Sequence, residues 1–249
     1  MSSPCTTPPA PEELHAQVWR ASSLGGSASA CVPSGFAALD AELPGGGWPT
    51  RGLSEILLPR PAVLEWRLLA PALRGAGTSK PLLLINPPLV PHLAGLQACG
   101  LPPQQLVWIR AETPQQQLWA AEQAIKSNAA AAVLAWLPQA RPEQIRRLQT
   151  HALSTEAPVF VFRPLQQARR QSSAAPLRLA VDAVDWALQL RILKRRGPVF
   201  DGVLNLPALP TDLARVMTPR MLAPQSAPAL DPVEHSHALA RPAQPLAVP

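Results

Sequence analysis

Residues 53–73 read LSEILLPRPAVLEWRLLAPAL and join two structural patterns in one short stretch. The run LSEILL (53–58) is short and apolar, as in a buried strand, and PAVLEWRLLAPAL (61–73) is long enough for a helix. A strand that passes through a short loop into a helix is the repeating unit of α/β proteins with parallel sheets. The stretch therefore predicts an α/β fold, and its loop is where many such folds bind phosphate.

Strand and helix patterns continue to alternate after residue 73. Apolar runs at 81–86, 105–110, 130–137 and 158–162 predict strands, and residues 113–128 and 142–153 predict helices. Thr113 can cap the first of these helices, with Pro114 at its first position and Gln116 completing a capping box. This order predicts a mostly parallel sheet that is covered by helices on both faces.

The pattern changes to a period of two near residue 176. PLRLAVD (176–182) and WALQLRILKRR (186–196) both alternate between apolar and polar residues. In the second run we expect Trp186, Leu188, Leu190 and Ile192 on one face and Gln189 and Arg191 on the other. The two runs predict an antiparallel hairpin that is added at an edge of the sheet.

Composition divides the chain of 249 residues into three parts. Residues 1–30 are rich in Ser, Pro and small residues, and we expect a flexible leader that contains a short helix. Residues 31–210 hold the strand and helix patterns and are predicted to form the core domain. Residues 211–249 are rich in proline and are expected to be a disordered tail.

The chemistry of the whole chain argues against several classes of protein. Neither a signal-peptide pattern nor a membrane-length apolar run is present, so we expect a soluble, cytoplasmic protein without membrane contact. The three cysteines are widely spaced and lack a C-x-x-C pair, which disfavours a disulfide framework and a zinc site. The formal net charge of +6 permits contact with nucleic acid or another acidic partner without requiring it.

Four stretches together resemble the RecA-like ATPase core, and most closely the ImuA family of bacterial translesion-synthesis proteins. They are PSGFAALDAELPGGGWPTRGLSEIL (33–57), INPP (85–88), AAEQAIKSNAAAAVLAWL (120–137) and LRILKRRGP (190–198). The pairing of GFAALDAELPGGGWP with LKRRGP is the specific part of this resemblance. It implies a RecA-like, P-loop-type three-layer core with an antiparallel edge hairpin.

The same resemblance allows the phosphate loop of recombinases to be laid onto residues 58–65. A working loop needs glycines for close backbone approach, a Lys for the β- and γ-phosphates and a Ser or Thr for Mg²⁺. The glycine positions fall on Leu58 and Val63, the lysine position on Leu64 and the threonine position on Glu65. These side chains add bulk and a negative charge where phosphate would lie, so each of them opposes nucleotide binding.

Two further positions lead to the same expectation. Where recombinases place a catalytic Glu, this chain has Asn86, Pro87 and Pro88, and at the position of the Walker B Asp it has Trp136. The phosphate lysine, the water-polarising Glu and the Mg²⁺-side carboxylate are thus all replaced. We therefore expect a pseudo-ATPase with no catalytic residue, no nucleotide or other cofactor and no metal.

The densest positive charge lies at the end of the predicted hairpin. The candidates for contacting DNA backbone or an acidic partner are Arg191, Lys194, Arg195 and Arg196. The alternative is a charged strand end that only prevents edge pairing. Most tryptophans are expected to pack in the core, and Trp48 and Trp66 are the two candidate partner anchors.

The resemblance implies a role in DNA repair by damage-induced (SOS) mutagenesis. ImuA proteins are thought to work with ImuB, an inactive Y-family polymerase relative, and with an error-prone replicative-type DNA polymerase; RecA is a further candidate partner. The same group is also described as SulA-like, which implies instead a cell-division inhibitor acting on the FtsZ polymer. A divergent RecA-like ATPase that uses other residues is the third alternative.

Overall fold

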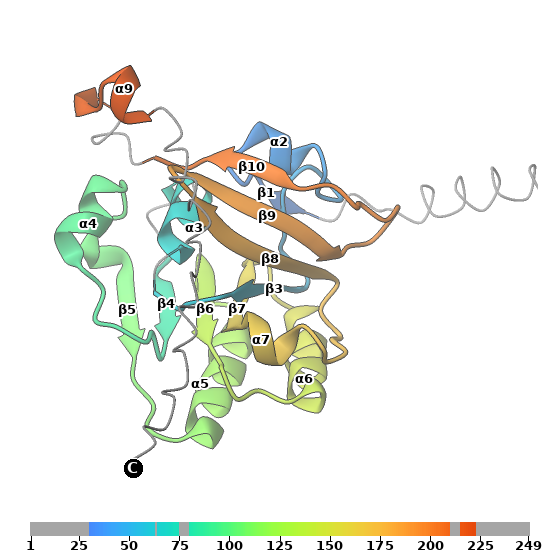
Figure 1. The fold of residues 1–249 in the computed structure, drawn as a ribbon. Helices are drawn as coiled ribbons and strands as arrows, with labels where there is room; N and C mark the ends of the chain where they lie inside the picture. Colours follow the sequence, from blue (N-terminus) through green and yellow to red (C-terminus); the bar gives the residue numbers. More distant parts are fainter. Residues whose placement is uncertain (1–29, 63, 75–79, 210–214, 223–249) are drawn as a thin grey trace, which may run out of the picture. The chain divides into compact units, whose positions relative to one another are not determined.

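The computed structural model describes residues 30–62, 64–74, 80–209 and 215–222. In this part of the chain eight strands form one mixed sheet in the order β10-β9-β8-β3-β7-β6-β4-β5, and β1 and β2 form a separate antiparallel pair (Figure 1). The strands are β1 (Cys31–Val32), β2 (Trp48–Pro49), β3 (Leu53–Leu58), β4 (Leu82–Ile85), β5 (Leu106–Ile109), β6 (Ala132–Trp136), β7 (Val159–Pro164), β8 (Leu177–Val184), β9 (Ala187–Lys194) and β10 (Leu204–Pro207).

The large sheet is parallel over most of its width. From β8 across β3, β7, β6 and β4 to β5, each strand is parallel to its neighbour, and β9 alone runs in the opposite direction, antiparallel to both β8 and β10. The predicted mostly parallel sheet and the antiparallel hairpin are therefore confirmed, but the hairpin does not form the edge of the sheet. The sequence did not predict β10, a strand of four residues that ends at Pro207 and takes the outer edge beside β9.

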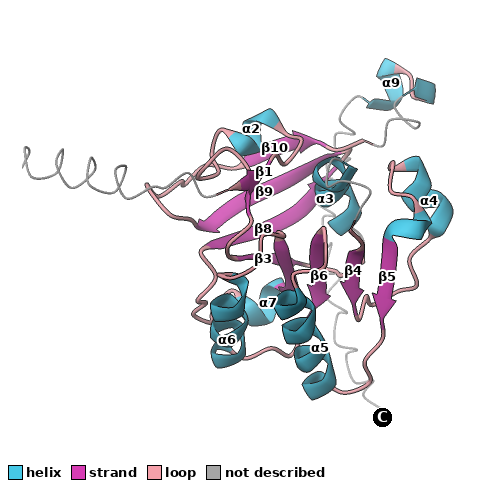
Figure 2. Cartoon of the chain, turned by 180° about the vertical axis from the view of Figure 1, so that it is seen from behind, coloured by secondary structure: helices cyan, strands magenta, loops and turns pink. Residues whose placement is uncertain are grey.

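Helices cover both faces of the sheet, as predicted. The short α2 lies with α3 and α4 over one face, and α5, α6 and α7 lie over the other (Figure 1; Figure 2). Each face has its own buried apolar cluster, with Leu68 and Phe160 in the first and Ile125 and Ile145 in the second. The helices are α2 (Ala37–Asp40), α3 (Glu65–Arg74), α4 (Leu93–Ala98), α5 (Pro114–Ser127), α6 (Pro142–Ala152) and α7 (Leu165–Ala168), with a 3₁₀ turn at Pro103–Gln105.

Helix α3 begins at Glu65, later than the residue 61 that the sequence pattern indicates. The reason is the backbone of Ala62, whose φ of 64° lies in the left-handed region that a right-handed helix excludes. The segment between β3 and α3 therefore forms a turn in place of a first helical turn.

Helix α5 begins as the sequence predicts. The backbone N–H of Gln116 donates to the hydroxyl of Thr113 (3.2 Å), and the backbone N–H of Thr113 donates to the side-chain oxygen of Gln116 (3.1 Å). Pro114 takes the first helical position, where its missing N–H leaves no bond unmade. Capping residues thus set this helix start locally, without help from distant contacts.

The chain up to Met217 forms one compact unit, and a second unit begins at Thr218. Within the second unit Pro219–Leu222 form the short helix α9, inside the segment that the sequence predicts to be disordered. The expected leader helix and the rest of the expected tail, in residues 1–29 and 223–249, lie outside the described residues. In the described ranges no helix combines the length and apolarity needed to cross a membrane.

Candidate functional site at the carboxyl ends of the central strands

The turn between β3 and α3 encloses the side chain of Glu65, which is fully buried. Its Oε1 accepts hydrogen bonds from the backbone N–H of Ala62 (2.6 Å) and from the indole Nε1 of Trp136 (2.8 Å). Its Oε2 accepts a hydrogen bond from the backbone N–H of Leu64 (3.0 Å). A single carboxylate thus binds two loop N–H groups and one side chain from β6.

The position of this carboxylate explains how an acidic residue is tolerated at the start of α3. The N-terminal end of a helix carries a partial positive charge and unpaired N–H groups, so it stabilises an anion. In a phosphate loop the anion is the phosphate of a nucleotide. Here the chain supplies the anion itself, through Glu65. From the sequence we expected the negative charge of this residue to repel phosphate. The structure shows that the carboxylate points into the protein and accepts hydrogen bonds there.

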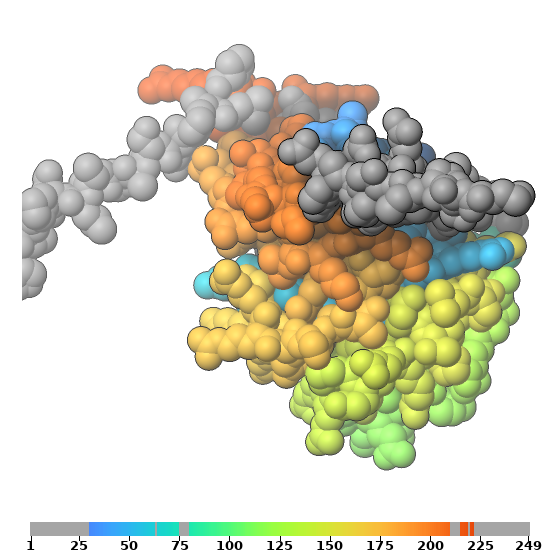
Figure 3. Space-filling model, turned by 90° about the vertical axis from the view of Figure 1, so that its right-hand side faces the viewer, coloured from blue at the N-terminus to red at the C-terminus, as the bar shows by residue number. Residues whose placement is uncertain are grey.

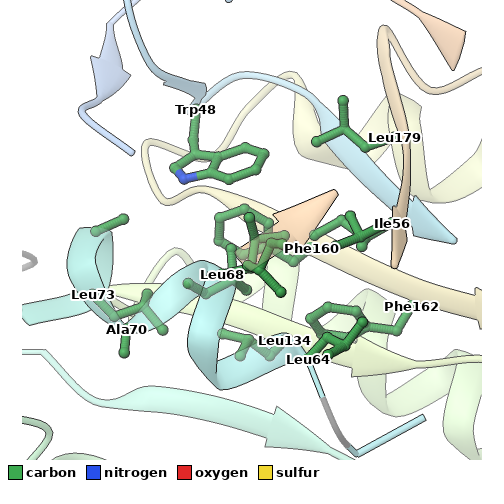
Figure 4. Close-up of a cluster of buried hydrophobic side chains, with 14 of the residues drawn as sticks. Trp48, Ile56, Leu64, Leu68, Ala70, Leu73, Leu134, Phe160, Phe162 and Leu179 are labelled. Atoms are coloured by element: carbon green, nitrogen blue, oxygen red, sulfur yellow. The ribbon is translucent and has the colours of Figure 1, made fainter. Parts of the chain in front are cut away.

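Apolar side chains fill the space around Glu65 and the turn between β3 and α3. The indole of Trp136 stacks on Phe162 with ring centroids 4.7 Å apart, and Trp66 lies tilted against Trp136 at 6.4 Å. Leu64 is buried in the same cluster as Phe162 (Figure 4). Leu58 is also buried, and Val63 lies outside the described residues.

A small cavity of about 100 Å³ remains at the carboxyl ends of the central strands. Ligand pockets for drug-sized molecules typically measure about 300–1,000 Å³, so this cavity is too small for a nucleotide. Four prolines line it, each from the segment at or after the end of a different strand: Pro61, Pro88, Pro138 and Pro164. Asn86 also lines the cavity, and among the described lining residues Arg163 alone is ionisable.

Arg163 is not available for chemistry because it belongs to a buried charge cluster. Its Nη1 donates to Oε1 of Glu55 on β3 at 2.8 Å, and its Nη2 donates to Gln171 at 2.6 Å. Arg178 of β8 forms a second ion pair with Glu55, with its Nε 2.9 Å from Oε2. All three charged side chains are buried, and the sequence analysis did not identify them. The sequence signal that could have revealed this cluster is the glutamate inside the apolar run LSEILL, because a carboxylate on a buried strand requires a buried cation as its partner.

The basic end of the hairpin is partly occupied by contacts within the protein. Arg195 pairs with Glu42 at 2.8 Å, donates to the carbonyl of Pro198 and lies over the ring of Phe200. Lys194 donates to the carbonyl of Ser173 at 2.7 Å. The charge of Arg195 is therefore not free as expected, because it already has a carboxylate, and contact of this residue with DNA or a partner stays a prediction.

The other two basic residues of the hairpin end remain exposed. The side chains of Arg191 and Arg196 form neither an ion pair nor a hydrogen bond among the residues that the structure describes. Figure 3 shows this side of the molecule, with the hairpin in orange above the yellow and yellow-green residues of α7 and α6. Of the four predicted contact residues, Arg195 alone forms an ion pair among the described residues, and Lys194 donates only to a neutral carbonyl.

Two tryptophans differ from expectation in their burial: Trp48 is more buried than predicted, and Trp186 is more exposed. Trp48 is fully buried and packs edge to face against Phe160, with ring centroids 5.2 Å apart, so the prediction that it anchors a partner is wrong (Figure 4). Trp66 is half-buried and lines a groove beside α3, which leaves it as the accessible candidate. Trp186, expected to pack with the apolar face of β9, lies in the turn before that strand and is 39% exposed.

The described residues contain no group of three or more His, Cys, Asp or Glu side chains that could hold a metal ion. Comparison of the chain with protein-family models and with curated proteins yields no match. Functional inference therefore depends on the geometry of this site and on the sequence resemblance.

Proposed function

We propose that this protein is a RecA-like adaptor without nucleotide chemistry that acts in damage-induced translesion DNA synthesis. Its partners would be an ImuB-like inactive Y-family polymerase and an error-prone replicative-type polymerase, with RecA as a further candidate. The observation that carries the proposal is the Glu65 carboxylate, which takes the loop N–H groups at the place where a RecA-like ATPase would bind phosphate.

Three features of the turn around Glu65 support the proposed absence of nucleotide chemistry. Its anion-binding N–H groups are already paired with Glu65, and Trp136 and Leu64 fill the adjoining space. The cavity that remains is about 100 Å³, and the only ionisable side chain lining it is held by Glu55. A nucleotide would have to displace a buried, hydrogen-bonded carboxylate before any phosphate contact formed.

A role through protein contacts is supported by the apolar side chains that the surface retains. Five large exposed apolar residues lie on the edge strand β5 or between the end of β4 and the start of α4: Leu89, Val90, Leu93, Val107 and Trp108. Val107 and Trp108 are neighbours on β5 and point to opposite faces of the sheet, so both faces of this edge keep apolar surface for a partner to cover. Direct DNA binding has less support, since the charge of Arg195 is already paired with Glu42 and Lys194 is bonded to a carbonyl, which leaves the side chains of Arg191 and Arg196 without a contact among the described residues.

The proposal is tested by titrating the full-length protein with a fluorescent ATP analogue and by capture of the ImuB-like polymerase from damaged cells. We expect no saturable binding of the analogue, capture of the polymerase, and loss of ultraviolet-induced mutation in a deletion strain. Saturable nucleotide binding by the unaltered protein would favour the divergent ATPase. Filamentous growth on overexpression, with normal induced mutation in the deletion strain, would favour the division inhibitor.

A further inference from the structure

Strand β5 is the outermost strand at one side of the large sheet, and no described strand pairs with its outer edge. Figure 1 shows β5 at the border of the sheet, with α4 beside its amino end. Its pairing with β4 is continuous, so no bulge interrupts it. Proteins commonly protect such an edge with a proline, a lysine or a bulge. Residues 106–109 contain none of these, and the edge is therefore open to another strand.

The bonds to β4 show which backbone groups of β5 point outward. The backbone N–H of Asn86 donates to the carbonyl of Ile109 (2.8 Å), so that carbonyl points toward β4. In a trans peptide the N–H of the next residue points the opposite way, which directs the N–H of Arg110 outward. Because this direction alternates along a strand, the N–H and C=O of Trp108 both point outward too. The N–H of Leu106 already donates to the 3₁₀ turn before it, so Leu106 offers only its carbonyl.

The side chains of β5 leave apolar surface on both faces of this edge. Trp108 is 41% exposed on one face of the sheet, and Val107 is 43% exposed on the other. Covering these side chains removes apolar area from water, which is favourable in proportion to that area. A strand that pairs here would therefore bury apolar surface on both faces while it bonds the outward N–H and C=O groups.

The order of side chains around Trp108 is nearly the same in both directions. Val107 and Ile109 flank it, and both are β-branched and apolar. Two copies that pair antiparallel with Trp108 opposite Trp108 place Val107 of each copy opposite Ile109 of the other. Arg110 then lies opposite Leu106 and not opposite a second arginine. Aromatic and β-branched pairs stabilise an antiparallel sheet, whereas like charges directly opposite each other destabilise it. The side chains thus favour this register.

The backbone favours the same register. Two opposite residues of an antiparallel pair exchange both of their N–H···O=C bonds only when both direct these groups across the gap. Trp108 meets this condition, and the N–H of Arg110 would reach the carbonyl of Leu106 in the other copy. A strand of another protein could bond the same backbone groups. The agreement between the backbone and the side chains about one two-fold centre is what favours a second copy of this chain.

We propose that a second copy of this chain pairs with β5, antiparallel and with a two-fold axis at Trp108, so that the two large sheets join into one. Such an interface uses the same surface patch on both copies and closes on itself, as in most symmetric dimers. The inference goes beyond the proposed adaptor role and does not depend on it. The nucleotide titration and the induced-mutation assay test that role whether or not the protein dimerises.

The test is sedimentation equilibrium of the full-length protein from micromolar to millimolar concentration, which should show a reversible dimer. Trp108→Lys places two lysines opposite each other, and Val107→Lys charges the other face, so a fold defect in one leaves the other informative. Each should raise the dimer dissociation constant at least about tenfold. Leu153→Lys, at an exposed site at the end of α6, should change it less than about twofold. A protein that stays monomeric, or a dimer that neither β5 variant weakens, would overturn the proposal.

A mixing experiment tests the two-fold register. Trp108→Glu alone should dimerise as weakly as Trp108→Lys alone, because each places like charges across the axis. An equal mixture of the two should pair at least about threefold more tightly than either variant by itself, since opposite charges then face each other. Absence of any gain on mixing would show that residue 108 does not face its own copy, and the proposal would fail.

Hydrogen exchange at the Trp108 amide identifies what covers the edge. Protection that appears only at concentrations at which the dimer forms supports the proposal. Slow exchange in a monomeric sample would assign the edge to a segment of this same chain. Fast exchange in a sample that stays monomeric at every concentration would leave the edge to a strand of another protein. Either of these last two results overturns the proposal.

Discussion

Glu65 and Trp136, which are 71 residues apart in the sequence, share a buried hydrogen bond of 2.8 Å between the carboxylate and the indole N–H. One residue begins the helix after β3, and the other ends β6. The sequence resemblance aligns these two positions with a Mg²⁺-binding hydroxyl and a metal-side carboxylate of recombinases. The Trp136 indole depends on this carboxylate, because its buried N–H would otherwise have no acceptor among the described residues, whereas Glu65 also accepts from the backbone N–H groups of Ala62 and Leu64.

Replacing Glu65 should destabilise the fold more than its position near a surface loop suggests. Glu65→Ala leaves two backbone N–H groups and the Trp136 indole without an acceptor, at a cost of about 1–3 kcal/mol for each group that stays buried. We expect a loss of at least about 3 kcal/mol in urea unfolding. Glu112→Ala, an exposed control at the start of the next helix region, should lie within about 0.5 kcal/mol of the unaltered protein. Equal stability of the two variants would show that the buried carboxylate is dispensable.

The buried charge cluster should respond asymmetrically to removal of its members. Glu55→Leu leaves Arg163 and Arg178 as two buried cations, and removal of one partner from a buried pair typically costs about 3–5 kcal/mol. Arg178→Met leaves the Arg163–Glu55 pair intact and should cost clearly less. The measurement is the midpoint and slope of denaturant unfolding for both variants. The reverse order would mean that Arg178, and not Glu55, holds the cluster together.

Trp48 should behave as a core residue. Trp48→Ala should cost about 3–5 kcal/mol, because it opens a cavity against Phe160, whereas Trp119→Ala, at a 62% exposed site, should change stability by less than about 0.5 kcal/mol. Trp48→Phe should be mild, since the buried indole Nε1 has no hydrogen-bond partner in the described part of the chain. Thermal unfolding of the three variants gives the ranking. A severe Trp48→Phe variant would indicate that the indole N–H is bonded after all.

Arg195 should contribute to stability and not to partner binding. Arg195→Ala removes the Glu42 ion pair, the Pro198 hydrogen bond and the contact with Phe200, and we expect a loss of roughly 1–3 kcal/mol. Arg196→Ala is the matched control next in the chain and should be nearly neutral in stability. Urea unfolding of the two variants tests this difference. Neutral behaviour of Arg195→Ala would return that residue to the set of free basic side chains.

Gly35 should not tolerate a side chain. Its φ of 84° is in the left-handed region, and an added Cβ would lie 2.4 Å from the Cβ of Pro71 on α3. Gly35→Ala should therefore cost about 2–4 kcal/mol from strain and overpacking together. Gly46→Ala, with a φ of 77° but open space around it, should cost only about 1 kcal/mol. Similar losses in the two variants would mean that the backbone strain alone decides.

The larger elements of the fold follow from local signals in the sequence. The capping box at Thr113 and Gln116 sets the start of α5, and the short apolar runs set the parallel strands. These signals depend on residues close together in the chain, which is why they can be identified without the structure. Strand β10 and the start of α3 could not be predicted, because a four-residue strand and a single left-handed Ala62 leave no periodic pattern.

In the candidate site, too, some features follow from residue identity and others from contacts between segments that are distant in the sequence. The sequence by itself determined that glycine, lysine and hydroxyl are missing from residues 58–65, since residue identity alone decides whether those groups are present. Only the tertiary structure decided what replaces them. Glu65 is bonded to Trp136 on β6. Arg195 is paired with Glu42, which lies far from it in the sequence. Trp48 is buried against Phe160. Burial and ion pairing arise where segments distant in the sequence come into contact. The sequence therefore identifies the candidate side chains, and the tertiary structure decides which charged groups and aromatic rings stay accessible to a partner.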